Sequence, residues 1–169
     1  GIPTKLNGKR KPLGEVIPVL NTLGGMHSIG RIDMFEDGIM DLKSREIYEA
    51  PGATIILKLH RDLEQFCLTK DEIQVKKGID QKWAYLIYHG MAYHPLRYDL
   101  DAFIEQSQKV VNGKYKIKLF KGNIEIVYRE SKTSLFSPEI RSIKATGFDQ
   151  RRCANAAFVR GLPFEILAK

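Results

Sequence analysis

The stretch KYKIKLFKGNIEIVYR at residues 114–129 alternates apolar and charged side chains on either side of a turn. A period of two is typical of a strand with one buried and one exposed face. Tyr115, Ile117 and Leu119 alternate with lysines, and Lys121-Gly122-Asn123 turns the chain back. The stretch therefore predicts an antiparallel β-hairpin, with Lys and Glu paired across its exposed face.

Three amphipathic helices are predicted before this hairpin. Apolar residues recur at helical spacing in residues 53–68, 79–91 and 95–111. The middle helix is expected to begin after Thr69, because Thr69 and Glu72 have the spacing of a capping box. A further helix is predicted over residues 13–26, ending at Gly24-Gly25.

The remaining segments suggest extended or irregular structure. Residues 30–50 predict a hairpin or two short strands around Asp37-Gly38, with Ile39 and Met40 directly after a tight turn. Residues 131–150 look like a loop. A short helix is expected over residues 154–160, ended by Gly161-Leu162-Pro163. Since strands and helices are grouped, the predicted fold class is α+β: an antiparallel sheet with a group of consecutive helices packed on it.

Composition indicates one globular domain. The 169 residues are 43% hydrophobic and carry a net charge of +7, of which Lys5, Lys9, Arg10 and Lys11 supply four. Residues 1–12 are expected to be a linker, and residues 13–169 a domain. No apolar run suits a membrane span or a secretory signal. Two cysteines predict free thiols and a cytoplasmic location rather than a disulfide scaffold.

Most motifs that carry chemistry are absent from the sequence. It holds no phosphate-binding loop, no metal-ligand spacing among its four histidines and two cysteines, and no nucleophile motif. We therefore assign no catalytic or metal-binding residue. His60 is interpreted as a hydrogen-bonded or surface histidine. The lysines at 114, 116 and 118 could follow a phosphate backbone, but the exposed face of a hairpin explains them better, and we expect no nucleic-acid partner.

The candidate site lies in residues 30–52, GRIDMFEDGIMDLKSREIYEAPG. This segment gathers acidic and basic side chains around a turn, as a site for a zwitterionic small molecule would require. A salt-bridged surface would have a similar composition, so composition alone leaves both interpretations open.

The sequence resembles the argininosuccinate synthase family in several pieces, in the same order and at the same spacing. They are GRID (30–33), KSR (43–45), YEAPG (48–52), HRDLE (60–64), AYLIYHG (84–90), KLFKGN (118–123), SLF (134–136) and GLP (161–163). The resemblance as a whole covers nearly all of residues 13–165. The chain departs from the family pattern at Asp37, Gly38, Asp41 and Glu46.

The resemblance implies a ligase of arginine biosynthesis. The family joins citrulline to aspartate: ATP adenylates the ureido oxygen of citrulline, and the aspartate amine then displaces AMP. Only the C-terminal synthetase and multimerisation domain of the family is matched, so residues 1–12 are expected to lead from an N-terminal nucleotide-binding domain. ATP and Mg²⁺ would serve the full-length enzyme and would not bind this part, which alone is expected to be inactive.

By position, the resemblance assigns citrulline contacts to Glu36 and Tyr48. It also implies a homotetramer, contact with the enzyme's own N-terminal domain, and self-association of this part, for which the helices over 79–91 and 95–111 are the candidate surfaces. No membrane partner is expected. The alternative is a stand-alone assembly or interaction module that has kept the fold and lost the chemistry.

Overall fold

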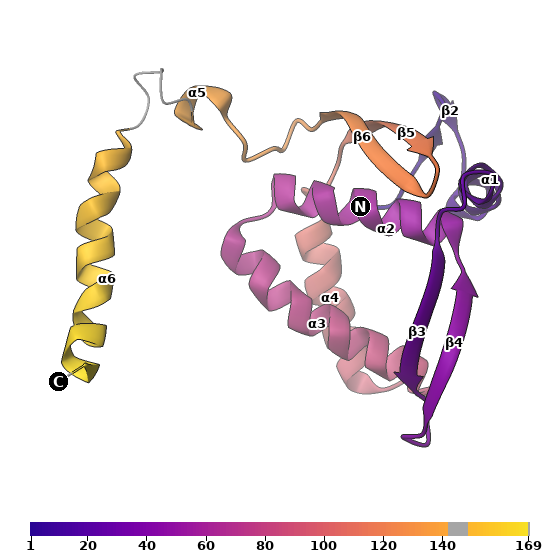
Figure 1. Cartoon of the computed structure of the whole chain (residues 1–169), viewed down its shortest axis with the longest axis horizontal. Helices are drawn as coiled ribbons and strands as arrows, with labels where there is room; N and C mark the ends of the chain where they lie inside the picture. Colours follow the sequence, from indigo (N-terminus) through magenta and orange to yellow (C-terminus); the bar gives the residue numbers. More distant parts are fainter. Residues whose placement is uncertain (142–148, 169) are drawn as a thin grey trace. The chain divides into compact units, whose positions relative to one another are not determined.

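The computed structural model describes residues 1–141 and 149–168, which divide into two units, Gly1–Leu135 and Phe136–Lys169. The fold class is α+β, as expected, and the strands described form three separate two-stranded antiparallel sheets (Figure 1). The elements of the first unit are β1 (Lys5–Leu6), β2 (Lys9–Arg10), α1 (Leu13–Gly25), β3 (Arg31–Asp37), β4 (Lys43–Glu49), α2 (Pro51–Cys67), α3 (Lys70–Tyr88), α4 (Pro95–Gln108), β5 (Lys114–Phe120) and β6 (Asn123–Glu130).

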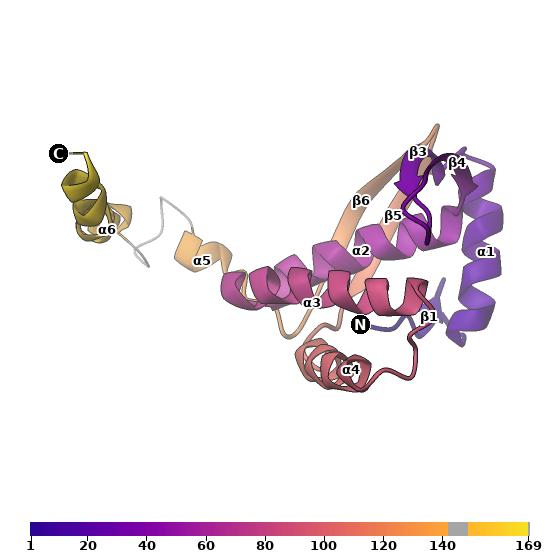
Figure 2. The ribbon, with the colours of Figure 1, turned by 90° about the horizontal axis from the view of Figure 1, so that it is seen from below.

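Helix α2 is the centre of the first unit, because it contributes to both hydrophobic clusters. Its Ile55, which is fully buried, packs with Val16 of α1 and Ile124 of β6. Near its C-terminal end, Leu63 and Cys67 pack with Leu68 and Val111. The β5–β6 hairpin lies along α2, as Figures 1 and 2 show from two directions. Burial of this apolar surface is the main force that holds the unit together.

Helices α1 and α2 approach closely at Gly52. The backbone N–H of Gly52 donates to Asn21 Oδ1 at 2.8 Å, which satisfies one of the free donors at the start of α2. A Cβ at position 52 would lie 3.0 Å from the carbonyl oxygen of Ile17. A glycine at this position therefore lets the two helix backbones meet.

The predicted helix starts are confirmed for α3 and α4. Thr69 Oγ1 accepts from the Glu72 N–H at 3.3 Å, and the Glu72 carboxylate accepts from the Thr69 N–H at 2.9 Å, which completes the capping box. Helix α4 begins with Pro95 at its first position. The two helices pack together, and Trp83 Nε1 donates to Asp101 Oδ1 at 2.8 Å.

The β5–β6 hairpin is also confirmed. Tyr115, Ile117 and Leu119 are partly buried, whereas the lysines between them are exposed. Lys118 lies opposite Glu125, and Lys114 Nζ is 3.7 Å from the Glu130 carboxylate. Acidic partners therefore offset part of the lysine row, as the exposed-face interpretation expects.

Residues 1–12, expected as a linker, contain regular structure. Strands β1 and β2 pair antiparallel, and Leu6 packs against the cluster around Ile55. The Lys11 N–H donates to the Thr4 carbonyl at 3.1 Å, closing the small hairpin. Whether this segment joins another domain stays a prediction.

The second unit contains α5 (Pro138–Arg141), a 3₁₀ turn (Gln150–Arg152) and α6 (Cys153–Leu167). The expected helix end at residues 161–163 is wrong, because α6 continues through Gly161 and Pro163. Proline removes one backbone donor, and helix formers on both sides keep the remaining hydrogen bonds. The loop expected over residues 131–150 includes α5, and residues 142–148 lie outside the described residues.

Candidate functional site

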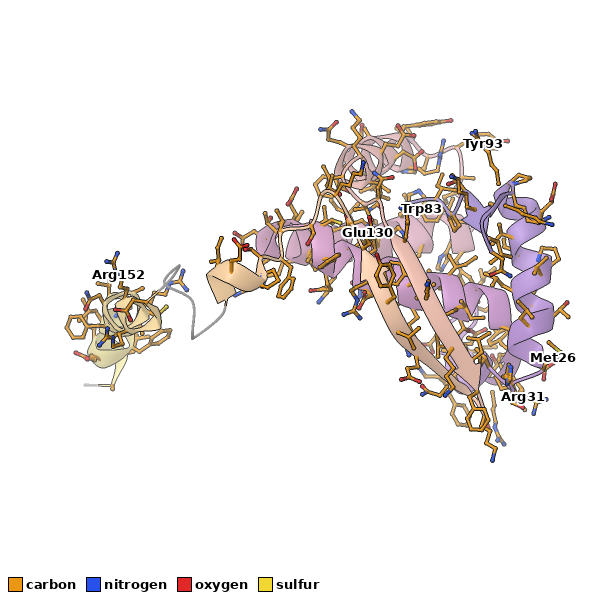
Figure 3. The ribbon with its side chains drawn as sticks, turned by 90° about the horizontal axis from the view of Figure 1, so that it is seen from above. Met26, Arg31, Trp83, Tyr93, Glu130 and Arg152 are labelled. Atoms are coloured by element: carbon orange, nitrogen blue, oxygen red, sulfur yellow. The ribbon has the colours of Figure 1, made fainter. Side chains whose placement is uncertain are left out.

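The candidate site is built on the β3–β4 hairpin. Arg31 pairs with Glu49 at its base, and Asp37 pairs with Lys43 next to the turn; Figure 3 marks Arg31 where β3 begins. The expected tight turn at Asp37-Gly38 is wrong. Residues 38–42 form a longer connection, closed by the Gly38 N–H donating to the Leu42 carbonyl at 3.0 Å, and this places Ile39 and Met40 in the turn.

Alternation along the two strands sorts the side chains onto two faces. Register places one set on what we call the acidic face: Ile32, Met34, Glu36, Ser44, Glu46 and Tyr48. It places the other set on what we call the ion-paired face: Arg31, Asp33, Phe35, Asp37, Lys43, Arg45, Ile47 and Glu49. All three cations of the hairpin strands (Arg31, Lys43 and Arg45) thus lie on one face, away from Glu36 and Tyr48.

The ion-paired face satisfies its charges internally. Arg45 donates two hydrogen bonds to Asp33, at 2.8 and 2.6 Å, and these hold the pKa of the Asp33 carboxyl below its usual range. Arg31 lies 2.9 Å from Glu49, and Lys43 lies 2.6 Å from Asp37. These pairs are exposed and stabilise the fold little, but they leave this face electrically balanced.

The acidic face brings the two predicted site residues into contact. The Tyr48 hydroxyl donates to Glu36 Oε1 at 2.7 Å. This hydrogen bond, with the negative charges of Glu36 and Glu46 nearby, raises the pKa of Tyr48 to about 12. Tyr48 therefore stays protonated at neutral pH and orients the Glu36 carboxylate, whose second oxygen remains able to accept from a ligand.

Glu46 is a third member of this face that sequence reasoning did not assign to the site. Its charge acts on Tyr48, and it shares the face with Glu36 through the strand register. In the part of the chain that the structure describes, no Lys, Arg or His lies within ion-pair distance of Glu36 or Glu46. Counting alternate residues from Glu36 and Tyr48 would have found it.

The other candidates from the sequence lie outside this face. His60 is hydrogen-bonded, as expected, with Glu64 and the Gly1 carbonyl as its partners. Cys67 is buried, Cys153 is exposed, and both are free thiols. A shallow hollow of about 270 Å³ lies between α3 and α4 and is lined by Trp83, Asp101, Ile104 and Glu105.

Two further features are absent from the described residues. Among residues 1–141 and 149–168, His, Cys, Asp and Glu side chains do not gather in threes as a metal ion would require. Within the same ranges, none of the helices combines the length and apolar character that crossing a lipid bilayer needs.

Comparison with known proteins shows a match to one family over nearly the whole chain. Residues 1–167 match the family described as "Arginosuccinate synthase C-terminal domain". The chain is 44% identical over its whole length to the argininosuccinate synthase of Nostoc punctiforme, and 41% identical over 96% of its length to those of Methanopyrus kandleri and Rubrobacter xylanophilus. It spans 42%, 41% and 40% of these relatives, so it corresponds to about two fifths of their length.

Proposed function

The chain belongs to the argininosuccinate synthase family, and on that premise we propose that its β3–β4 hairpin supplies Glu36 and Tyr48 to a citrulline site. The reaction would be the ATP-dependent joining of citrulline and aspartate in the longer enzyme. ATP and Mg²⁺ would be bound by other parts of that enzyme, and the present chain alone would be inactive.

The observation that carries the proposal is the Tyr48–Glu36 hydrogen bond on a face without cations. An amino-acid substrate presents an ammonium group, and an ionised carboxylate accepts short, strong hydrogen bonds from such a group. Because Tyr48 engages only one oxygen of Glu36, the other is available to the ammonium. The phenol oxygen of Tyr48 keeps its acceptor lone pairs for a second polar group of the substrate.

The balance of charge between the two faces supports the same assignment. An anionic group would be repelled by Glu36 and Glu46, which have no neutralising partner on their own face. The ion-paired face offers no such preference, because Asp33, Asp37 and Glu49 are each matched by a cation. The hairpin therefore favours a cationic group on the acidic face alone.

Replacing Glu36 by Gln in the longer enzyme is expected to reduce kcat/KM for citrulline by roughly ten- to a hundred-fold. A hydrogen bond to a charged group contributes about 1.5–3 kcal/mol, and the amide keeps the shape but loses the charge. Steady-state kinetics with citrulline varied, and with ATP and aspartate saturating, would measure the change. Glu49→Gln is the matched control, because Glu49 belongs to the same hairpin but lies on the ion-paired face.

Equal kinetics for Glu36→Gln, Glu49→Gln and the unmodified enzyme would refute the citrulline assignment. That result would favour the alternative, in which this part of the protein acts in assembly and has no contact with the substrate. Loss of activity in both variants would point to disruption of the hairpin rather than to substrate contact at Glu36.

Self-association is the second part of the proposal. Every described side chain of α6 is at least partly exposed, including Phe158, Phe164 and Ile166, so the second unit offers apolar surface to another subunit. In the first unit, Tyr85, Tyr88 and Tyr98 are exposed on α3 and α4, the helices expected from the sequence to form subunit contacts. We propose that these surfaces are covered in a homotetramer and by the enzyme's own N-terminal domain.

A further inference from the structure

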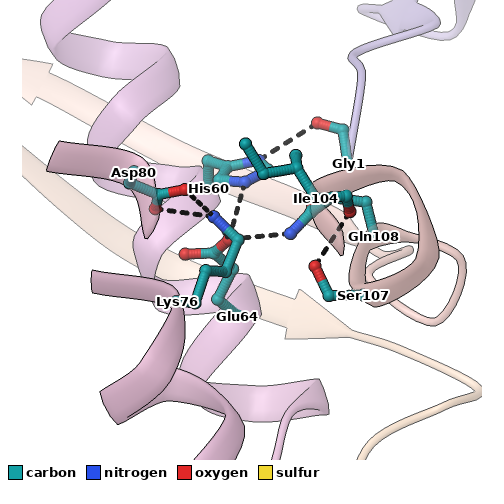
Figure 4. A network of polar contacts seen from close by, with 8 residues as sticks. All are labelled: Gly1, His60, Glu64, Lys76, Asp80, Ile104, Ser107 and Gln108. Atoms are coloured by element: carbon teal, nitrogen blue, oxygen red, sulfur yellow. Dashed lines mark hydrogen bonds and ion pairs between the residues drawn. The ribbon is translucent and has the colours of Figure 1, made fainter. Parts of the chain in front are cut away.

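Gly1 lies against two side chains, one from α2 and one from α4. His60 Nδ1 is 3.1 Å from the Gly1 carbonyl oxygen (Figure 4). A Cβ at position 1 would lie 2.2 Å from Gln108 Oε1 and 2.5 Å from His60 Cε1. A side chain at position 1 would therefore have to displace the Gln108 amide and the His60 ring from their present positions, whereas glycine leaves both in place.

The carboxylate of Glu64 links the two side chains that lie against Gly1. Glu64 Oε1 lies 3.1 Å from His60 Nε2, accepts from Gln108 Nε2 at 2.8 Å, and is 2.9 Å from Lys76 Nζ. Partial burial alone would raise the pKa of Glu64, but the hydrogen bonds from His60 and Lys76 outweigh burial and lower it to about 2. Glu64 is therefore ionised at neutral pH and connects the two residues that touch Gly1.

Lys76 extends this group to α3. Its side chain is almost fully buried, and its ammonium also donates to Asp80 at 2.7 Å. Three helices thus meet at one carboxylate: α2 through Glu64, α3 through Lys76 and α4 through Gln108. We call the set His60, Glu64, Lys76 and Gln108 the clasp.

The segment after Gly1 has a second point of attachment. Leu6 of β1 packs against the hydrophobic cluster of α1, α2 and β6, and the β1–β2 ladder holds the strand in position. Residues 1–6 are therefore held at both ends, by a polar contact at Gly1 and an apolar contact at Leu6. A flexible tether would make neither contact.

We propose that the clasp makes the segment before α1 a rigid joint: the backbone at Gly1 is held by His60 of α2, and Glu64 links His60 to α3 and α4. In a longer protein such as the relatives described above, the chain that precedes Gly1 would join this domain at a fixed position. The clasp, and not a flexible linker, would then set the direction of that preceding chain relative to the β3–β4 hairpin. This inference goes beyond the proposed function, since it concerns how the domain is held and not what it binds.

Amide hydrogen exchange of the 169-residue chain tests the joint. We expect the hydrogen-bonded amides of the β1–β2 ladder and of Lys11 to be protected, and to exchange at least about tenfold faster in Gly1→Ala and in His60→Ala. Amides of β5 and β6 should keep their protection in Gly1→Ala, because that change leaves the Glu64–Lys76 pair intact. His89→Ala is the control, since His89 Nδ1 contacts the Tyr85 carbonyl of its own helix and has no contact with Gly1.

Two results would overturn the joint. One is that the amides of the β1–β2 ladder and of Lys11 exchange at the unprotected rate in the unmodified chain. The other is unchanged protection of these residues in Gly1→Ala, and this variant decides the question even if His60→Ala fails to fold. Because exchange is measured without any substrate, either result is independent of whether Glu36 and Tyr48 bind citrulline.

Discussion

Replacing Lys76 by Met is expected to lower the free energy of unfolding by about 3–5 kcal/mol. Methionine keeps most of the buried stem, so the main loss is the positive charge. Glu64 would then lack its cation at the point where α2, α3 and α4 meet. A carboxylate left without its cation in a mostly buried position is costly, because neither water nor an opposite charge stabilises it fully.

Urea unfolding followed by fluorescence of Trp83, the single tryptophan, would measure this loss. Lys77→Met is the matched control, because Lys77 is the next residue of α3 and is exposed; its effect should stay within about 0.5 kcal/mol. Equal losses in the two variants would show that the buried ion pair does not hold the helices together.

The pH dependence gives a second readout of the same pair. The pKa of Glu64 falls from 4.5 to about 2 on folding, so the stabilisation is fully present above pH 4.5. It is lost as the pH falls from 4.5 toward 2, because the unfolded chain binds the proton first. Without Lys76, one of the groups that lower this pKa is absent, and the variant should lose less stability over that interval than the unmodified chain.

Replacing Ile55 by Ala is expected to cost about 2–5 kcal/mol of the free energy of unfolding. Ile55 of α2 is 0% exposed and packs against α1 and β6. Its truncation would leave a cavity that the closely packed neighbours cannot close. Circular dichroism during urea unfolding would measure the change. The control is Leu57→Ala on the same helix, where the side chain is 51% exposed and little apolar contact is lost. Similar costs for both truncations would contradict the central place of α2 in the core.

Local signals in the sequence predicted most of the secondary structure. Alternation identified the β5–β6 hairpin, and the capping residues Thr69 and Glu72 located the start of α3, because both patterns depend on neighbours close in the chain. Patterns of this kind carry no information on which hairpins join. Whether the three hairpins join into one sheet or stay separate depends on tertiary packing, which periodicity does not encode.

Two errors of prediction came from residues that usually interrupt structure. Asp37-Gly38 suggested a tight turn directly followed by Ile39 and Met40 in a strand, but the register that pairs Asp37 with Lys43 places residues 38–42 in a longer connection. Gly161 and Pro163 suggested a helix end, but α6 tolerates one missing donor. In both segments the preference of two residues for a turn or a helix end was outweighed by their surroundings.

The candidate site was predicted in part. Glu36 and Tyr48 were assigned through family resemblance, and the structure shows that they touch; their contact with citrulline stays a proposal. Glu46 could have been found by alternation, because it lies two residues before Tyr48 on the same strand; the register then places both on the face of Glu36. The clasp could not be read from the sequence, because Gly1, His60 and Gln108 are far apart along the chain and their approach is a tertiary contact.

The structure of the longer enzyme with citrulline bound would test the central claim most directly. The account predicts that the citrulline ammonium lies within about 2.7–3.2 Å of a Glu36 carboxylate oxygen, with Tyr48 contacting a second polar group of the substrate. Citrulline bound elsewhere, with the acidic face of the β3–β4 hairpin free of substrate, would contradict it.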